Sequence, residues 1–568
     1  SGAALARPRG RSALRMSTTS EPVALSARVE DAGVPWDQGS WRSFYRSAPA
    51  EDSYSLEVPA LPADLVGTFF RNVPAKFEVG DTQVVHPFDA DGMLAALTFD
   101  GSGNVYFRNR FVRTRGFVRE QMEGRSLYAG MFGNPKPFWN NGLTPKNLAN
   151  TNVLWWGGRL LALWEGGRPH LMDPLSLATS RESDLAGLLK PGETFSAHPR
   201  FDRARKRLVN FAYSPNPLTG TKLTFFEFGE NFRPVDIDKP RLERTIPGFL
   251  LVHDFAITAN YYVVSAAPTN LGGNPIDLLL GKKAVGEAIE FDEKKPTFLW
   301  LIPRDGSEPI SFEVETHFCF HHANAYEDAQ GRVCLDSCRS PKLELGGTSG
   351  KEVAKKAWEM EYATLPVPSL WRYTLDVRAK TASSQHIFKR YVDFPSVDPR
   401  RAARAHRFVY AATGSEGGLV AAPAKGVVKI DTSETADHQI WLTPGPTQFA
   451  GEPLFVPRAG AAADSAEDDG YVLLPIIDGE RGGLATVHVL RADRLSDGPI
   501  ASVELETFLP HGLHGTFVEE LVPKKEEIEQ ATTLMKMYAR KSREWNKVDG
   551  SFAGFGIASL FQKGVDGR

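Results

Sequence analysis

Residues 152–165 read NVLWWGGRLLALWE, two runs of β-forming residues on either side of Gly157-Gly158. Adjacent glycines between such runs are typical of a hairpin with a two-residue turn. We therefore expect strands at residues 152–156 and 159–165. Similar short runs, separated by Gly, Pro, Asn and Asp, lie at residues 104–114, 261–267, 426–431, 471–478 and 484–490.

Many short strands without alternating helices favour an all-β barrel, sandwich or propeller. The length of 568 residues would ordinarily suggest about four domains, but one closed propeller is the most economical arrangement at this size. No repeat of fixed period is legible, so the pattern does not support the propeller families that such a repeat defines. The residues alone predict a large all-β protein.

The composition excludes several classes of protein. Charged residues make up 24% and aromatic residues 11% of the chain, which is typical of a folded domain. A net charge of −3 provides no basic stripe for nucleic acid, so we expect no nucleic-acid partner. Three cysteines are too few for a disulfide framework. No apolar run is long enough to cross a membrane.

The two ends differ from the body of the chain at residues 36–519. We expect residues 1–35 to form a leader, since the first 20 residues carry four arginines and no acid. That bias is typical of an organellar transit peptide, which would place the protein in the plastid. A disordered leader on a cytoplasmic protein is the alternative. Residues 520–568 form a tail of unknown role with a helical pattern at 524–547, and a second short helix is possible at 350–359.

Two segments are unusually apolar. Residues 271–281 read LGGNPIDLLLG and are followed by Lys282 and Lys283. Leucines next to lysines suit a patch that enters a membrane interface, and a short helix packed on the body is the alternative. Residues 552–561 carry three phenylalanines. Contact with lipid, docking to a partner and packing back on the domain are the alternative roles for this segment.

Four of the 13 histidines lie in specialised local contexts. None has the close spacing of a zinc protease, and the gaps between them run from tens of residues to nearly two hundred. Ligands so far apart must converge from different blades on one axis. Taken singly, each would more often be a structural histidine. The four are His198, His253, His321 and His514.

Carboxylates inside apolar runs accompany these histidines. Glu165 follows Leu163-Trp164, and Asp393 and Glu452 lie in similar settings. A lone acid in an apolar run is costly unless it is paired, and a metal-bound imidazole usually anchors its other N–H on a carboxylate. Four imidazoles suit a metal such as iron better than magnesium or calcium, which prefer oxygen ligands.

At these residues the sequence resembles the carotenoid cleavage oxygenase family, most closely its cyanobacterial apocarotenoid branch. The resemblance runs from about Trp36 to about Phe517, and its landmarks follow the family's order. They are residues 67–72 (GTFFRN), 86–93 (HPFDADGM), 111–114 (FVRT), 147–152 (NLANTN), 163–167 (LWEGG), 196–199 (SAHP), 253–255 (HDF), 321–327 (HHANAYE), 467–470 (EDDG) and 514–515 (HG).

The resemblance implies a seven-bladed β-propeller with a helical, apolar cap over an axial iron site. One Fe(II) per chain would be held by the four histidines named above. His321 matches the family's ligand better than His322, because that ligand directly follows the Phe. Glu165, Asp393 and Glu452 match the acids that orient the second, third and fourth histidines, whereas the first has no carboxylate partner.

Three positions depart from the family's pattern. Asp393 stands where the family has Glu, which shortens the reach by about 1.5 Å. Either the backbone moves inward or a water bridges to His321, and weaker iron retention is a possible consequence. Ala90 and Val73 replace glycines at expected turns, so we expect local backbone adjustment there.

By resemblance, the protein uses O₂ to split a conjugated C=C bond of an apocarotenoid into two carbonyl products. Thr151 matches a residue that screens a coordination position. Phe132, Trp164 and Phe320 match aromatic residues of the substrate tunnel, with propeller core as the alternative role. An apolar polyene would bring the protein to a membrane surface through residues 271–281. Cleavage of a full-length C40 carotenoid or a stilbene-like alkene, and carotenoid binding without turnover, remain alternatives.

Overall fold

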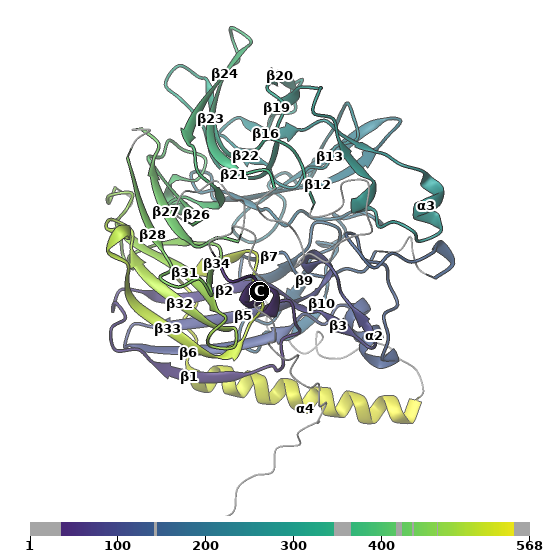
Figure 1. Ribbon diagram of the computed structural model, residues 1–568, viewed down its shortest axis with the longest axis vertical. Coiled ribbons are helices and arrows are strands. Elements are labelled where there is room, and N and C mark those ends of the chain that lie inside the picture. The colour runs from purple at the N-terminus through teal and green to yellow at the C-terminus, as the bar shows by residue number, and fades with distance from the viewer. Residues whose placement is uncertain are drawn as a thin grey trace, which may run out of the picture.

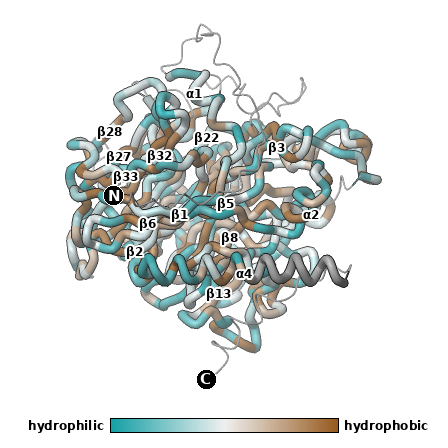
Figure 2. The backbone as a smooth tube through the Cα atoms, turned by 90° about the horizontal axis from the view of Figure 1, so that it is seen from below, coloured by the Kyte–Doolittle hydropathy of each residue, from teal (hydrophilic) through white to brown (hydrophobic). Residues whose placement is uncertain are grey.

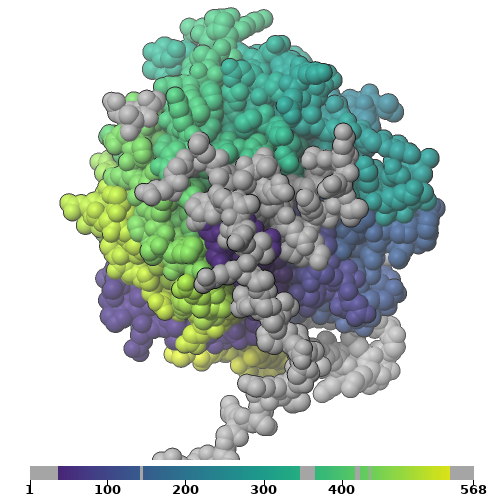
Figure 3. Space-filling model, viewed as in Figure 1, coloured from purple at the N-terminus to yellow at the C-terminus, as the bar shows by residue number. Residues whose placement is uncertain are grey.

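The computed structural model describes residues 36–140, 145–345, 365–415, 423–433, 437–462 and 464–549. These residues form seven antiparallel sheets of four or five strands, together with two small two-stranded sheets. The sheets follow one another around the molecule in chain order, so that the first and the last are neighbours (Figure 3). The fold is a seven-bladed β-propeller, and the all-β prediction is confirmed.

In blades 1 to 4, each strand pairs with the strand named next to it. Blade 1 is β1 (Ser53–Glu57), β6 (Asn104–Phe111), β5 (Asp91–Asp100), β2 (Val66–Lys76) and β34 (Gly515–Val518). Blade 2 is β10 (Thr179–Glu182), β9 (His170–Met172), β8 (Arg159–Leu163) and β7 (Asn152–Trp156). Blade 3 is β11 (Arg200–Asp202), β12 (Arg207–Asn216), β13 (Gly220–Phe228) and β14 (Leu242–Ile246). Blade 4 is β15 (Ala256–Ile257), β16 (Tyr261–Ala266), β19 (Thr297–Pro303) and β20 (Ile310–Val314).

Blades 5 to 7 complete the ring. Blade 5 is β21 (Phe318–Glu327), β22 (Val333–Ser340), β23 (Ser369–Asp376) and β24 (Thr381–Phe388). Blade 6 is β25 (Val392–Ser396), β26 (Phe408–Thr413), β27 (Gly426–Asp431) and β28 (His438–Leu442). Blade 7 is β29 (Gln448–Ala450), β31 (Gly470–Asp478), β32 (Leu484–Arg491) and β33 (Pro499–Phe508), with β30 (Leu454–Pro457) also paired to β31. The small sheets are β3 (Glu78–Val79) with β4 (Thr82–Gln83), and β17 (Thr269–Leu271) with β18 (Ile289–Phe291).

The Gly157-Gly158 hairpin forms as expected. β7 and β8 pair from Asn152 with Leu163 to Trp156 with Arg159. The two glycines between them have φ angles of 55° and 70°, both in the left-handed region that a two-residue hairpin turn of this kind requires. The other five predicted runs are also strands, with ends that agree within a few residues.

The ring closes by pairing the two ends of the propeller sequence. β34, the last strand, pairs antiparallel with β2 of blade 1, from Thr68 with Val518 to Arg71 with Gly515. This pairing closes the ring and makes β34 an edge strand of blade 1. The edge strands nearest the axis contact one another around the ring: β34 with β7 and β30, β15 with β11 and β21, and β21 with β25.

The hydrophobic core is divided among the seven spaces between blades. Each of the seven largest clusters joins strands of two adjacent blades. In one of them, Phe69 and Phe107 of blade 1 pack with Leu473 of blade 7. Both faces of a middle strand are therefore covered, and nine of the ten residues of β5 are buried, whereas the outermost strand β1 alternates between exposed and half-buried residues.

Four α-helices lie outside the blades of the described chain: α1 (Gln38–Ser43), α2 (Arg115–Glu123), α3 (Pro275–Leu279) and α4 (Lys525–Asp549). The predicted tail helix is α4, which lies along the outside of the molecule (Figures 1 and 2). Ile528 anchors it by complete burial. No helix in the described ranges has the length and apolar composition needed to span a bilayer. The expectations for residues 1–35, 350–359 and 552–561 fall outside the described residues.

The turn expected at Val73 is wrong, whereas Ala90 does lie at the end of a turn. Val73 lies inside β2, opposite Met93, and not at a turn. Ala90 follows the 3₁₀ turn η1 (Pro87–Asp89) with φ of −80° and ψ of 142°, which is ordinary extended backbone. Neither position needs the conformations that only glycine adopts freely. The described helical elements that line the apolar cavity on the propeller axis, which is described below, are only the short α1 and η1. The helical cap therefore stays a prediction.

Candidate metal centre

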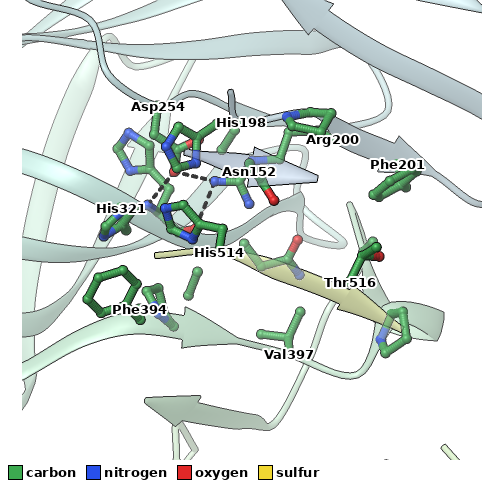
Figure 4. Close-up of a pocket in the computed structure, with 18 of the residues that line it drawn as sticks. Asn152, His198, Arg200, Phe201, Asp254, His321, Phe394, Val397, His514 and Thr516 are labelled. Atoms are coloured by element: carbon green, nitrogen blue, oxygen red, sulfur yellow. Dashed lines mark hydrogen bonds and ion pairs between the residues drawn. The ribbon is translucent and has the colours of Figure 1, made fainter. Parts of the chain in front are cut away.

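Four histidines from four blades meet on the propeller axis. His198 precedes β11, His253 precedes β15 and His514 precedes β34, whereas His321 lies within β21. One ring nitrogen of each lies within 4.8 Å of the others, and three of the side chains are buried. His198, His321 and His514 converge in Figure 4. The structure therefore brings together the four histidines that the sequence singled out.

The predicted carboxylates each contact one histidine. Glu165 Oε2 lies 2.7 Å from His253 Nδ1, and Glu452 Oε1 lies 2.8 Å from His514 Nδ1. Glu452 also accepts a hydrogen bond from the backbone N–H of Gly515 at 2.8 Å. These contacts hold each Nδ1 proton and leave Nε2 free as a ligand atom.

Asp393 reaches His321 directly, despite its shorter side chain. Its Oδ1 lies 2.6 Å from His321 Nδ1, so no bridging water is needed. β25 shifts register between Asp393 and Ser396, and Phe394 adopts a φ of 51°. A bulge bends its strand locally, and we infer that this bend carries the carboxylate inward to His321.

The donor set fits a metal ion with a preference for nitrogen ligands. Nε2 of His321 is buried without a hydrogen-bond partner, and Nε2 of His198 lies 2.9 Å from Nε2 of His253. Burial lowers the pKa of His198, and it also lowers the pKa of His514 against the opposing effect of Glu452. Burial acts in the same direction on the pKa of His253, but the Glu165 carboxylate outweighs it and the net shift is upward. Imidazole nitrogens suit iron, zinc, copper or nickel.

The histidines separate two cavities along the axis. Leu251, Phe320 and Leu513, which precede histidines in the sequence, line an apolar cavity of about 310 Å³. Arg200, Ala323 and Thr516, which follow histidines, line a second cavity of about 230 Å³. Since the inner strands continue past the histidines, the two cavities lie on opposite sides of the centre. Figure 4 shows the second cavity.

The aromatic residues predicted for the substrate tunnel all line the apolar cavity: Phe132, Trp164 and Phe320. Phe320 meets the ring of His253 edge-on, with centroids 5.4 Å apart. Thr151 lines the same cavity at the start of β7, and its Oγ1 lies 3.0 Å from Asn150 Oδ1. The cavity therefore combines an aromatic wall with access to the metal centre.

The other histidines of these motifs have local partners. His322 Nδ1 lies 2.7 Å from Ser337 Oγ, and His317 Nδ1 lies 2.8 Å from the carbonyl oxygen of Glu315. His511 Nε2 donates to the carbonyl of Ala450 at 3.2 Å, although its ring also lines the apolar cavity.

Sequence reasoning missed two neighbours of the centre. Phe394 packs against His321 and His514, with centroids 5.0 and 5.3 Å away. Asp254 Oδ1 lies 4.0 Å from His198 Nδ1, beyond hydrogen-bond distance, and Asp254 pairs instead with Arg200. Both residues stand beside residues already singled out, and that adjacency was the signal available.

The family model described as retinal pigment epithelial membrane protein matches residues 45–519, which span all seven blades. The chain belongs to the carotenoid oxygenase family. Among carotenoid oxygenases, the apocarotenoid-15,15'-oxygenase of Synechocystis sp. is 38% identical over 515 residues, which cover 88% of this chain and 99% of the relative. The carotenoid 9,10(9',10')-cleavage dioxygenase 1 of Phaseolus vulgaris is 30% identical over 502 residues, which cover 81% of this chain and 85% of that relative.

Solved structures of the family share the fold. The crystal structure of cobalt-substituted Synechocystis apocarotenoid oxygenase superposes with a TM-score of 0.77 at 36% identity, and it covers 85% of this chain and 98% of that one. The carotenoid oxygenase fold and a site able to hold a non-haem metal ion therefore occur together in this chain.

Proposed function

We propose that this protein is a non-haem Fe(II) dioxygenase that cleaves one conjugated C=C bond of an apocarotenoid to two carbonyl products. One observation carries the proposal. Four histidines, three of them buried and three of them anchored on carboxylates, form one end of an apolar aromatic cavity. His198, His253, His321 and His514 would hold the ion.

Bound there, a ferrous ion would supply the redox chemistry by which O₂ splits an alkene. The protein positions the substrate. Aromatic walls bury a polyene at roughly 25 cal/mol per Å² of apolar surface and exclude water from the reacting bond. Glu165, Asp393 and Glu452 keep the Nδ1 protons of three ligands in place. No acid–base pair is needed, because the substrate and one O₂ together account for every atom of the two products and no proton is gained or lost.

His253→Ala tests the ligand assignment. Wild-type protein should retain about one iron per chain after desalting, and His253→Ala should retain almost none and lose turnover of apocarotenals. His386→Ala is the matched control, since His386 lies on the outermost strand of blade 5, stacked on Trp371, and should keep both properties. Full iron content and activity in His253→Ala would refute the assignment.

We further propose that the protein takes its substrate from a membrane surface through a patch around α3. The patch comprises Phe138, Trp139, Ile276, Leu279 and Leu280, which are 40% to 66% exposed. Gly281, which follows α3, packs against the backbone of Lys136, so the segment with Phe138 and Trp139 lies beside α3. Helix α3 lies at the rim of the propeller (Figure 1). Exposed apolar side chains with nearby lysines favour an anionic bilayer surface.

Liposome flotation tests this patch. The double variant Leu279→Glu/Leu280→Glu should lose most of the fraction that floats with vesicles containing phosphatidylglycerol. Leu218→Glu is the control, because Leu218 is 93% exposed in the hairpin between β12 and β13. Equal flotation of all three proteins would contradict the proposal.

A further inference from the structure

The apolar cavity carries a histidine that the proposed mechanism does not use. His86 directly precedes η1, is 7% exposed and lines the cavity. Its ring stacks on Phe132 with centroids 5.0 Å apart and meets Phe88 edge-on at 4.8 Å. An imidazole thus lies among the aromatic rings of the cavity wall.

One hydrogen bond of His86 fixes the position of its proton. Nδ1 accepts a hydrogen bond from the backbone N–H of Phe88 at 3.2 Å, so the neutral ring carries its hydrogen on Nε2. Burial lowers the pKa of His86 to about 3, and the ring is therefore neutral at physiological pH. His86 remains a donor at Nε2 across that range.

Nε2 of His86 has no hydrogen-bond partner in the described part of the chain, and the imidazole ring lines the cavity. A donor left unpaired in an apolar environment is costly. A ligand oxygen that accepts this hydrogen removes the cost, whereas a hydrocarbon does not.

We propose that His86 Nε2–H binds the oxygen at the polar end of the substrate, so that the cavity selects polyene aldehydes and alcohols over polyene hydrocarbons. This inference rests on the proposed function and names the substrate class of the same cavity. His511 cannot do this for an aldehyde, because its donor already serves Ala450 and its other nitrogen only accepts. Tyr391, whose buried side chain also lines the cavity, is one competing donor.

Two substitutions separate the donor from the rest of the ring. His86→Asn places an amide oxygen near the position of Nδ1, where it still accepts from Phe88 and caps η1, but it ends short of Nε2. His86→Gln places an amide near Nε2 and retains the donor. Tyr391→Phe removes the competing hydroxyl.

The measurement is the ratio of kcat/KM for an apocarotenal to that for a hydrocarbon polyene with the same number of conjugated bonds, with iron-loaded protein in air. His86→Asn should lower this ratio about 10- to 100-fold, as expected when a buried oxygen loses its donor. His86→Gln should keep most of it. An unchanged ratio in His86→Asn, an equal loss in both His86 variants, or a loss in Tyr391→Phe alone would overturn the assignment.

Anaerobic binding spectra distinguish failure of this inference from failure of the proposed function. A hydrogen bond donated to a polyene aldehyde shifts its absorption to longer wavelength. The wild type should show this shift on binding apocarotenal and His86→Asn should not, whether or not turnover follows in air. The same bound spectrum in both proteins would refute the role of His86. Absence of products from the wild type in air would instead refute the dioxygenase.

Discussion

Asp393→Asn isolates the charge that supports one ligand of the metal centre. The substitution keeps the size and one oxygen of the side chain but removes its negative charge. In the structure, Asp393 Oδ1 lies 2.6 Å from His321 Nδ1 and accepts from the backbone N–H of Phe394 at 2.9 Å. Burial raises the pKa of Asp393, but His321 and the Phe394 N–H outweigh it and hold that pKa below its ordinary value.

The expected loss follows from this contact. A hydrogen bond to a charged group is about twice as strong as a neutral one, and loss of an outer partner usually lowers metal affinity 10- to 100-fold. Because Asn keeps one acceptor oxygen, we expect the lower limit, about tenfold or about 1.4 kcal/mol. Co(II) or anaerobic Fe(II) titrated against a chelator of known affinity measures it.

The matched control is Asp336→Asn. Asp336 is more completely buried than Asp393, and its Oδ2 lies 2.9 Å from His406 Nε2, but neither residue of this pair belongs to the metal centre. It should leave metal affinity within about twofold of the wild type. An equal fall in both variants, or an unchanged affinity in Asp393→Asn, would refute the reasoning.

Asp393→Glu should also weaken metal binding in the chelator assay, because the direct 2.6 Å contact leaves no room for another methylene; affinity at or above wild type would contradict this. In urea unfolding, Gly158→Ala should cost about 1 kcal/mol for its positive φ. Gly157→Ala should cost more, since its Cβ would lie 2.9 Å from a backbone oxygen, and equal losses would count against this. Burial raises the pKa of Asp336, but His406 and an arginine hold it below its ordinary value. Its stabilisation is therefore present near neutral pH and fades below about pH 4. The stability difference between wild type and Asp336→Asn should shrink there, and a constant difference would contradict the assignment.

Local features of the fold could be predicted from the sequence, and its closure could not. The turn at Gly157-Gly158 follows from neighbouring residues, and both glycines have the expected positive φ. The pairing of β34 with β2 joins residues more than 400 positions apart, and no local pattern encodes such a contact. At Val73 local reasoning failed. A turn was predicted there because the family usually has glycine at this position, but Val73 lies inside strand β2.

The metal centre was predictable in its members but not in its geometry. Each histidine stands in a recognisable motif, yet the distance from Asp393 to His321 depends on a bulge in β25 that one sequence does not reveal. His86 stood in a landmark motif without any role. Its significance depends on which ring nitrogen accepts the Phe88 N–H, and that depends on the turn of η1.

Mass spectrometry of the products tests the proposed dioxygenase most directly. Iron-loaded protein is incubated in air with a panel of apocarotenals, and the products are compared with those of His253→Ala. We predict two carbonyl fragments whose masses sum to the substrate plus O₂, formed by the wild type and not by the variant. Recovery of intact substrate from wild-type protein that holds about one iron per chain would contradict the dioxygenase.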